Sequence, residues 1–192
     1  MHSSFIFLAD GFEEIEALTP VDVMRRAGMD VKTVSINDTR HVTGAHGVTI
    51  TADLTFKEAD FDRAEWLICP GGLPGAENLH NFDPLSDLLK VHSHKGSIAA
   101  ICASPAMVLA PLGILKDKEA TGYPGTEDSL RAGGAIVRDA PVINSGRIIT
   151  GNGPSSSLRF ALAIVAATMG EHTAQQIGSA MLYYPKSVNF YF

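Results

Sequence analysis

The sequence predicts an α/β fold in which a mostly parallel sheet is covered by helices on both faces. Short and nearly uninterrupted apolar runs, such as residues 5–9 and 65–69, are typical of strands buried on both faces. Segments with helical spacing alternate with these runs along the chain. Glycine, proline and aspartate separate the two kinds of segment, so we expect strand–helix–strand crossovers of the parallel type.

The first half of the chain alternates predicted strands with two helices. Asp10 and Gly11 end the strand 5–9, and acidic residues then open a helix that stops at Gly28, an order that the helix dipole favours. Asp83 is the expected N-cap of a helix that runs to residue 94. The other segments predicted in this half are strands at 31–36, 48–51 and 65–69.

The second half contains shorter segments between glycine and proline breaks. A strand at 97–101 leads directly into Cys102 and a helix at 104–109, which Pro111 and Gly113 end. Ser155 or Ser156 caps a helix that runs to residue 169. The remaining predicted segments are strands at 136–137, 142–143 and 147–150, and a last helix at 173–181.

Length and composition favour one domain over residues 1–192. The chain is 45% hydrophobic and 19% charged, a balance typical of a folded core. The net charge of −6, with no run of lysine or arginine, argues against a nucleic-acid or anionic-membrane partner. The longest apolar run, 160–167, is about half the length of a membrane span. Two cysteines and no targeting segment lead us to expect a cytoplasmic protein.

Cys102 stands where a buried strand ends and a helix begins. A side chain at such a turn projects from the carboxyl edge of the sheet, as in a nucleophile elbow, although the Gly-x-Ser-x-Gly pattern of hydrolases is absent. A helix N-terminus at this place would lower the pKa of the thiol. Position alone equally allows a small buried side chain. For Cys69, core packing is expected, and a resolving partner for Cys102 is the alternative.

Two further features converge on the same sheet edge. Gly71 and Gly72 follow the strand 65–69 and permit a tight turn with inward N–H groups, which is either an oxyanion hole or an ordinary turn. Glu16 lies on the helix that leaves the first strand. A protonated carboxyl there could donate a hydrogen bond to a thiolate or an oxidised sulfur. A solvated helix face is the alternative for it and its acidic neighbours.

No metal or cofactor site is predicted. His92 and His94 are two residues apart on a predicted helix and do not face together. The glycines at 151–153 fit no nucleotide-binding spacing.

The segments that carry these features resemble the ThiJ/PfpI superfamily, in its DJ-one branch. The resemblance runs in order over about residues 4–182 and is carried by an acidic helix, a glycine loop, a cysteine turn and a late helix that begins with Gly153 and Pro154. The first three segments read GFEEIEALTPVDVMRRAG at 11–28, PGGLPGAENL at 70–79 and AICASPA at 100–106.

This resemblance implies a flavodoxin-like three-layer sandwich that forms a homodimer through its first helix. Cys102 matches the reactive cysteine, and Glu16 matches the acid that hydrogen-bonds it. Gly71 and Gly72 match the residues that supply oxyanion N–H groups. The activities that the resemblance implies are cofactor-free glyoxalase and deglycase chemistry, redox sensing and chaperone action.

Three departures from the family pattern limit the transfer. Tyr123 stands where this branch has a histidine near the cysteine, and an ordinary tyrosine is no base near neutral pH. Ala103 stands where the protease-like branch has its histidine, so we expect no peptidase activity. Tyr123 and Pro154 are expected to line the pocket. The aromatic-rich end, 183–192, matches nothing in the family and is either a packed tail or an interface strip.

Three hypotheses of different classes follow. In the first, Cys102 attacks a small reactive carbonyl or a glycated protein, Glu16 moves the proton, and the N–H groups of Gly72 and Ala103 hold the oxygen. In the second, the protein is a redox sensor or chaperone whose Cys102 is oxidised to a sulfinic acid. In the third, the protein is a structural dimer with an ordinary thiol.

Overall fold

The computed structural model describes residues 2–183, and its centre is a seven-stranded sheet. The strand order is β10-β11-β7-β6-β1-β2-β5, and each neighbouring pair is parallel except β10 with β11. The prediction of a mostly parallel sheet is therefore confirmed. Its strands are β1 (Ser4–Leu8), β2 (Val31–Ser35), β5 (Leu54–Thr55), β6 (Trp66–Cys69), β7 (Ser97–Ile101), β10 (Val142–Ser145) and β11 (Ile148–Gly151).

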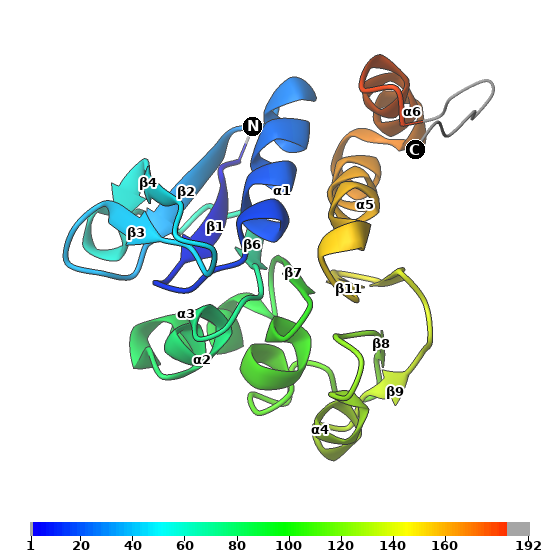
Figure 1. Cartoon of the computed structure of the whole chain (residues 1–192). Coiled ribbons are helices and arrows are strands. Elements are labelled where there is room, and N and C mark those ends of the chain that lie inside the picture. Colours follow the sequence, from blue (N-terminus) through cyan, green and yellow to red (C-terminus); the bar gives the residue numbers. More distant parts are fainter. Residues whose placement is uncertain (1, 184–192) are drawn as a thin grey trace.

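Helices cover both faces of this sheet (Figure 1). On one face, α1 packs against α5, and α5 packs against α6. On the other face lie α2, α3, α4 and a π-helical turn, η2. The result is the expected flavodoxin-like, three-layer arrangement. The helices are α1 (Glu14–Arg26), α2 (Gly75–His80), α3 (Asp83–His92), α4 (Glu127–Ala132), α5 (Ser157–Met169) and α6 (Glu171–Ala180), with the turns η1 (Phe56–Glu58), η2 (Pro105–Leu109) and η3 (Pro154–Ser156).

Side chains of the central strands alternate between two hydrophobic clusters. Ile6 and Leu8 of β1 join the cluster beneath α1 and α5, whereas Phe5 and Phe7 join the cluster beneath α2 and α3. All four are fully or almost fully buried. Burial of a side chain of this size contributes about 1.5–3 kcal/mol, so the two clusters hold the helical layers against the sheet.

Two small sheets lie outside the central one. β3 (His41–Thr43) and β4 (Thr49–Thr51) form an antiparallel hairpin, and β8 (Glu119–Ala120) pairs with β9 (Ile136–Val137). The hairpin contacts the chain just before α1, because Gly11 N–H donates to Thr43 O at 2.8 Å. Within residues 2–183, none of the helices combines the length and apolar character needed to cross a membrane.

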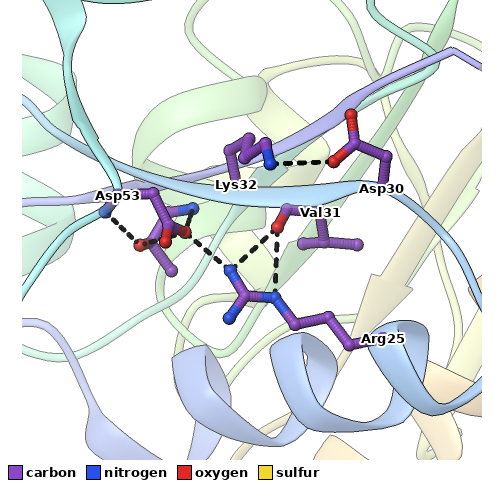
Figure 2. A network of polar contacts seen from close by, with 6 residues as sticks. Arg25, Asp30, Val31, Lys32 and Asp53 are labelled. Carbon is purple, nitrogen blue, oxygen red and sulfur yellow. Dashed lines mark hydrogen bonds and ion pairs between the residues drawn. The ribbon is translucent and has the colours of Figure 1, made fainter.

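A polar network ties the C-terminal end of α1 to β2 and to the residue before β5 (Figure 2). Arg25 Nη2 donates to Val31 O at 2.9 Å and to Asp53 Oδ2 at 2.6 Å. Asp53 Oδ2 also accepts hydrogen bonds from the Thr33 N–H and hydroxyl groups. Burial acts to raise the pKa of Asp53, but the hydrogen bonds from Thr33 and the charge of Arg25 outweigh it and lower that pKa. The network thereby anchors the helix that carries Glu16.

The helix expected at 104–109 is present as the π-helix η2, and one detail of another predicted helix was wrong. Asp83 was expected as an N-cap, but Phe82 takes that position and Asp83 is the first residue of α3. In both cases the apolar pattern located the segment, whereas its backbone geometry was not predicted.

Five short elements were not predicted. These are α2, α4, β3, β5 and β8, each of six residues or fewer. Segments of this length contain too few apolar residues to show a period, so tertiary contacts decide their conformation.

Candidate active site

The candidate site lies where the chain changes direction across the sheet. From β1 the chain passes to β2 on one side, and it later returns to β6 on the other side of β1. In open α/β sheets such a switch point leaves a crevice at the carboxyl ends of the strands. The segments that follow β1, β6 and β7 contain Glu16, Gly71 and Cys102, and the structure brings these three residues together.

Cys102 directly follows β7 and has a positive φ of 65°. Only a small part of non-glycine residues adopts this left-handed conformation, and such residues gather at functional sites. Two backbone hydrogen bonds hold Cys102 in place: its N–H donates to Gly151 O at 2.9 Å, and its carbonyl accepts from Tyr123 N–H at 2.7 Å. The side chain is largely buried, with 8% exposed. The turn is therefore fixed by the end of β11 and by the loop that contains Tyr123.

Glu16 reaches Cys102 from the first turn of α1. Its side chain is fully buried, and Oε2 accepts a hydrogen bond from Gly71 N–H at 2.9 Å. Its other oxygen, Oε1, is buried without a hydrogen-bond partner among residues 2–183. A buried carboxylate oxygen without a donor disfavours the anion, so this environment favours the protonated acid.

Gly71 separates the two side chains and allows them to approach each other. A Cβ atom at this position would lie 2.6 Å from Glu16 Oε2, 2.6 Å from Cys102 Cβ and 3.1 Å from Cys102 Sγ. No larger residue fits without moving one of the two groups. The Gly71 carbonyl accepts from Glu13 N–H at 3.0 Å, which fixes the loop against the start of α1.

The pKa values of Glu16 and Cys102 are coupled. Burial raises the pKa of Glu16 to about 7, although hydrogen bonds from the Cys102 thiol and the Gly71 N–H act against the rise. Burial and the negative charge of Glu16 raise the pKa of Cys102 to about 12, and the N–H groups of Gly72 and Ala103 act to lower it. The two groups therefore share protons as a pair.

The raised pKa of Cys102 is opposite to the direction expected from sequence. The expectation relied on the helix N-terminus after the cysteine and did not include burial or the charge of Glu16, which raise the pKa. The stabilising groups are instead single N–H donors, from Gly72 and Ala103. Because part of the rise comes from the Glu16 anion, moving the proton to Glu16 removes that part and favours the thiolate.

Tyr123 and Pro154 lie at the outer side of this turn. Tyr123 is half-exposed and follows Gly122, whose Cβ would contact the Cys102 carbonyl at 3.3 Å. Pro154 opens η3 just after β11, and a Cβ on the preceding Gly153 would contact the Tyr123 ring at 3.5 Å. Tyr123 and the start of η3 are thus neighbours, and the Tyr123 backbone is bonded to Cys102.

Cys69 does not join Cys102. It is fully buried in the cluster beneath α2 and α3, whereas Cys102 belongs to the cluster beneath α1 and α5. Burial raises the pKa of Cys69 to about 12. The two thiols are therefore on opposite faces of the sheet. This position agrees with core packing of Cys69 and not with a role as resolving partner for Cys102.

Sequence patterns gave no site role to Glu13 or Ser104. Glu13 is buried and its Oε2 accepts from Glu16 N–H at 2.7 Å, which caps α1. Its place before the helix is an N-cap signal, but glutamate is not a favoured residue there. The Ser104 hydroxyl donates to Pro70 O at 2.5 Å and joins the cysteine turn to the glycine loop. No local pattern marks that contact, because it links two separate strands.

One group of side chains has the spacing of metal ligands. In the part of the chain that the structure describes, Glu13, Glu14 and His46 bring three possible ligand atoms within 4.8 Å of one another. Their atoms already have protein partners: Glu14 Oε2 and His46 Nδ1 are 2.8 Å apart, and Glu13 bonds Glu16 N–H. We assign no metal to this group.

Comparisons with known proteins agree with the resemblance seen in the sequence. Protein DJ-1 homolog A of Arabidopsis thaliana is 34% identical over 179 residues, which are 93% of this chain and 46% of that protein. The chain thus spans about half the length of that relative. The glutathione-independent glyoxalase DJR-1.2 of Caenorhabditis elegans is 35% identical over 159 residues, which are 82% of this chain and 83% of that protein.

The fold comparison gives the same result. The solved structure of oxidized DJ-1 from Toxoplasma gondii matches with a TM-score of 0.91 at 34% identity, and the match covers 96% of this chain and 100% of that one. The model of the DJ-1/PfpI family matches residues 2–167. The resemblance is therefore confirmed, and this chain belongs to the DJ-1/PfpI family.

Proposed function

We propose that the protein converts small reactive carbonyl compounds, such as α-oxoaldehydes, with Cys102 as the nucleophile and without a cofactor. The observation that carries this proposal is the meeting of Glu16 and Cys102 over Gly71, with a buried carboxyl oxygen that has no partner of its own. Addition of a thiol to a carbonyl group needs a nucleophilic sulfur and an acid that protonates the oxygen. Cys102, with its N–H donors, and Glu16 are suited to these two roles. The glyoxalase name of the C. elegans relative supports the same class of chemistry.

The first step is a balanced addition. The Glu16 carboxylate first takes the proton of the Cys102 thiol, and the resulting thiolate donates its electron pair to the aldehyde carbon of methylglyoxal. As the S–C bond forms, the C=O π electrons move to oxygen, which takes the proton from Glu16. The N–H groups of Gly72 and Ala103, which already contact the sulfur, are the donors nearest to the developing charge. The product is a hemithioacetal, and Glu16 is left as a carboxylate.

The second step returns the enzyme to its starting state. The Glu16 carboxylate accepts the proton from the hemithioacetal carbon, and a proton is returned to the neighbouring carbon through an enediol. This shift leaves a thioester, which water hydrolyses to lactate and the free thiol. The sum is methylglyoxal plus water to lactate, so neither an oxidant nor a reductant is consumed. A glycated amine would enter by substitution: the Cys102 sulfur bonds to the adduct carbon, the C–N bond breaks, and the leaving amine takes the proton from Glu16.

The test is methylglyoxal turnover by the purified full chain. We expect Cys102→Ala to abolish turnover, and Cys69→Ala to retain it because Cys69 lies on the other face of the sheet. Turnover by Cys102→Ala equal to that of the unmodified protein would exclude this function.

A redox-sensing or chaperone role in oxidative stress is the second candidate, because the same acid could hold an oxidised sulfur. The Cys102 thiolate attacks one oxygen of hydrogen peroxide, the O–O bond breaks and water leaves, which gives a sulfenic acid. A second peroxide gives the sulfinic acid. Intact mass after mild peroxide treatment should then rise by two oxygen atoms at Cys102. Absence of that product would exclude this role.

We further propose a homodimer in a reducing compartment such as the cytoplasm. Ile15 and Leu18 are exposed on α1, with 54% and 37% of their surfaces accessible, and lie three residues apart on one helix face. Both cysteines are unpaired, which suits a reducing compartment. Sedimentation of the unmodified protein and of the Leu18→Glu variant tests the dimer. We expect a dimer for the first and a monomer for the second, and a monomer for both would exclude the dimer.

A further inference from the structure

Glu13 is bonded to both segments that meet at Cys102. Its Oε2 accepts from Glu16 N–H at 2.7 Å, so its carboxylate caps the turn of α1 that carries Glu16. Its own N–H donates to Gly71 O at 3.0 Å, so its backbone holds the loop that carries Gly71. Only 8% of its surface is exposed. A shift of Glu13 would therefore move Glu16 and Gly71 together.

Glu13 also places a negative charge beside Glu16. A negative charge beside a buried carboxyl group disfavours its anion, so the Glu13 charge acts to raise the pKa of Glu16. The Glu13 carboxylate accepts a hydrogen bond at the N-terminus of α1, whereas Glu16 Oε1 has no donor among residues 2–183.

We propose that Glu13 is a positioning residue for the Cys102 site, which fixes the backbone of Glu16 and, by its charge, favours the protonated form of Glu16. This inference deepens the proposed function, since it rests on Glu16 being the proton donor to the reacting group. Glu13 itself contacts neither the sulfur nor the substrate.

The charged groups around this pair come from three elements. Cys102 faces Glu16 from the turn after β7, and Gly71 contributes only its N–H from the loop after β6. On the outer side of Glu13 lie Glu14 and, from the hairpin between β3 and β4, His46. Because Glu14 pairs with His46, Glu14→Gln removes a neighbouring negative charge without touching the bond to Glu16. It is therefore the matched control.

The experiment is the rate of Cys102 alkylation by iodoacetamide as a function of pH, followed by peptide mass spectrometry in the full chain. Glu13→Gln keeps an oxygen that can accept from Glu16 N–H but removes the charge. Glu16 then ionises more easily and its anion disfavours the thiolate, so the alkylation profile should move to higher pH. Glu13→Asp keeps the charge and an acceptor, so its profile should stay close to that of the unmodified protein. Glu14→Gln should leave the profile in place.

Each outcome decides the proposal. A purely structural role predicts unchanged midpoints for all variants that fold, and superimposable profiles for Glu13→Gln and the unmodified protein would overturn the inference. An equal shift in Glu14→Gln would also overturn it, because any nearby charge would then suffice. If Glu13→Gln does not fold, Glu13→Ala is measured against Glu13→Asp: a shift to higher pH in Glu13→Ala alone supports the inference, and superimposable profiles overturn it.

Alkylation needs no turnover, so the two proposals fail separately. Methylglyoxal turnover is measured on the same samples. A shifted profile in a protein without turnover would leave this inference standing and remove the proposed reaction. Turnover in the unmodified protein, with an unshifted profile in Glu13→Gln, would support the proposed reaction and overturn the inference about Glu13.

Discussion

The carboxyl group of Glu16 and the sulfur of Cys102 meet over the backbone of Gly71, where a single Cβ atom would lie 2.6 Å from Glu16 Oε2 and 3.1 Å from Cys102 Sγ. The two residues come from distant segments of the chain: Glu16 lies on the helix after β1, and Cys102 lies in the turn after β7. Their contact makes the protonation of one depend on the other, and this dependence is the basis of the first prediction.

Replacing Glu16 with glutamine should separate thiol reactivity from turnover. An amide keeps the shape and a hydrogen-bond donor but cannot deliver a proton, and a positioned acid or base typically contributes about 10²–10⁴-fold in rate. Methylglyoxal turnover should fall by that factor, while iodoacetamide should still alkylate Cys102. Turnover within about threefold of the unmodified protein would show that Glu16 does not transfer the proton.

Replacing Gly71 with alanine should disrupt the pair directly. The new methyl group would overlap Glu16 and Cys102, so we expect turnover to fall by at least about 100-fold and stability by about 1–3 kcal/mol. Gly28→Ala is the control, because its φ of +80° makes alanine costly by about 1 kcal/mol while no atom lies within 4 Å. Equal loss of turnover in both variants would mean that destabilisation alone explains the effect.

Replacing Asp53 with alanine should weaken the attachment of α1. The change removes the acceptor of Arg25 and of both Thr33 donors, which should cost about 1–3 kcal/mol in urea unfolding. Because folding lowers the pKa of Asp53, its contribution is present above the ordinary value of 3.8 and is lost as the pH falls below it. Asp38→Ala, which removes an exposed pair with Lys57, should leave stability unchanged. Equal stability of both variants would contradict the anchoring role.

His92 should make the fold sensitive to mild acid. Its ring is buried, and the backbone groups of Glu65 and Ser97 raise its pKa less strongly than burial lowers it. Burial lowers its pKa from 6.5, so its neutral form contributes stability above pH 6.5 that is lost as the pH falls towards the folded-state value. The loss is about 1.4 kcal/mol for each pH unit between the two values.

The measurement is urea unfolding between pH 7.5 and 5. His92→Gln should show a flatter dependence of stability on pH than the unmodified protein, and exposed His94→Gln should not. Parallel curves for all three proteins would assign the acid sensitivity to other groups.

Local sequence was sufficient for the layers and for the position of the cysteine. Apolar runs located β1, β6 and β7 within one or two residues, because buried strands must be apolar on both faces. The break after residue 101 located Cys102 at a strand end. The acidic start of α1 and the two glycines after β6 placed the other groups at the same sheet edge.

Only the tertiary structure decided how those groups act. The pKa values of Glu16 and Cys102 depend on desolvation by residues far apart in the chain, and the charge of Glu16 acts against the low thiol pKa that the following helix was expected to produce. The same applies to Glu13, which a sequence pattern cannot separate from Glu14 beside it. Periodicity reports which face of an element is apolar, but burial, hydrogen-bond partners and charge pairing arise only when distant strands are brought together.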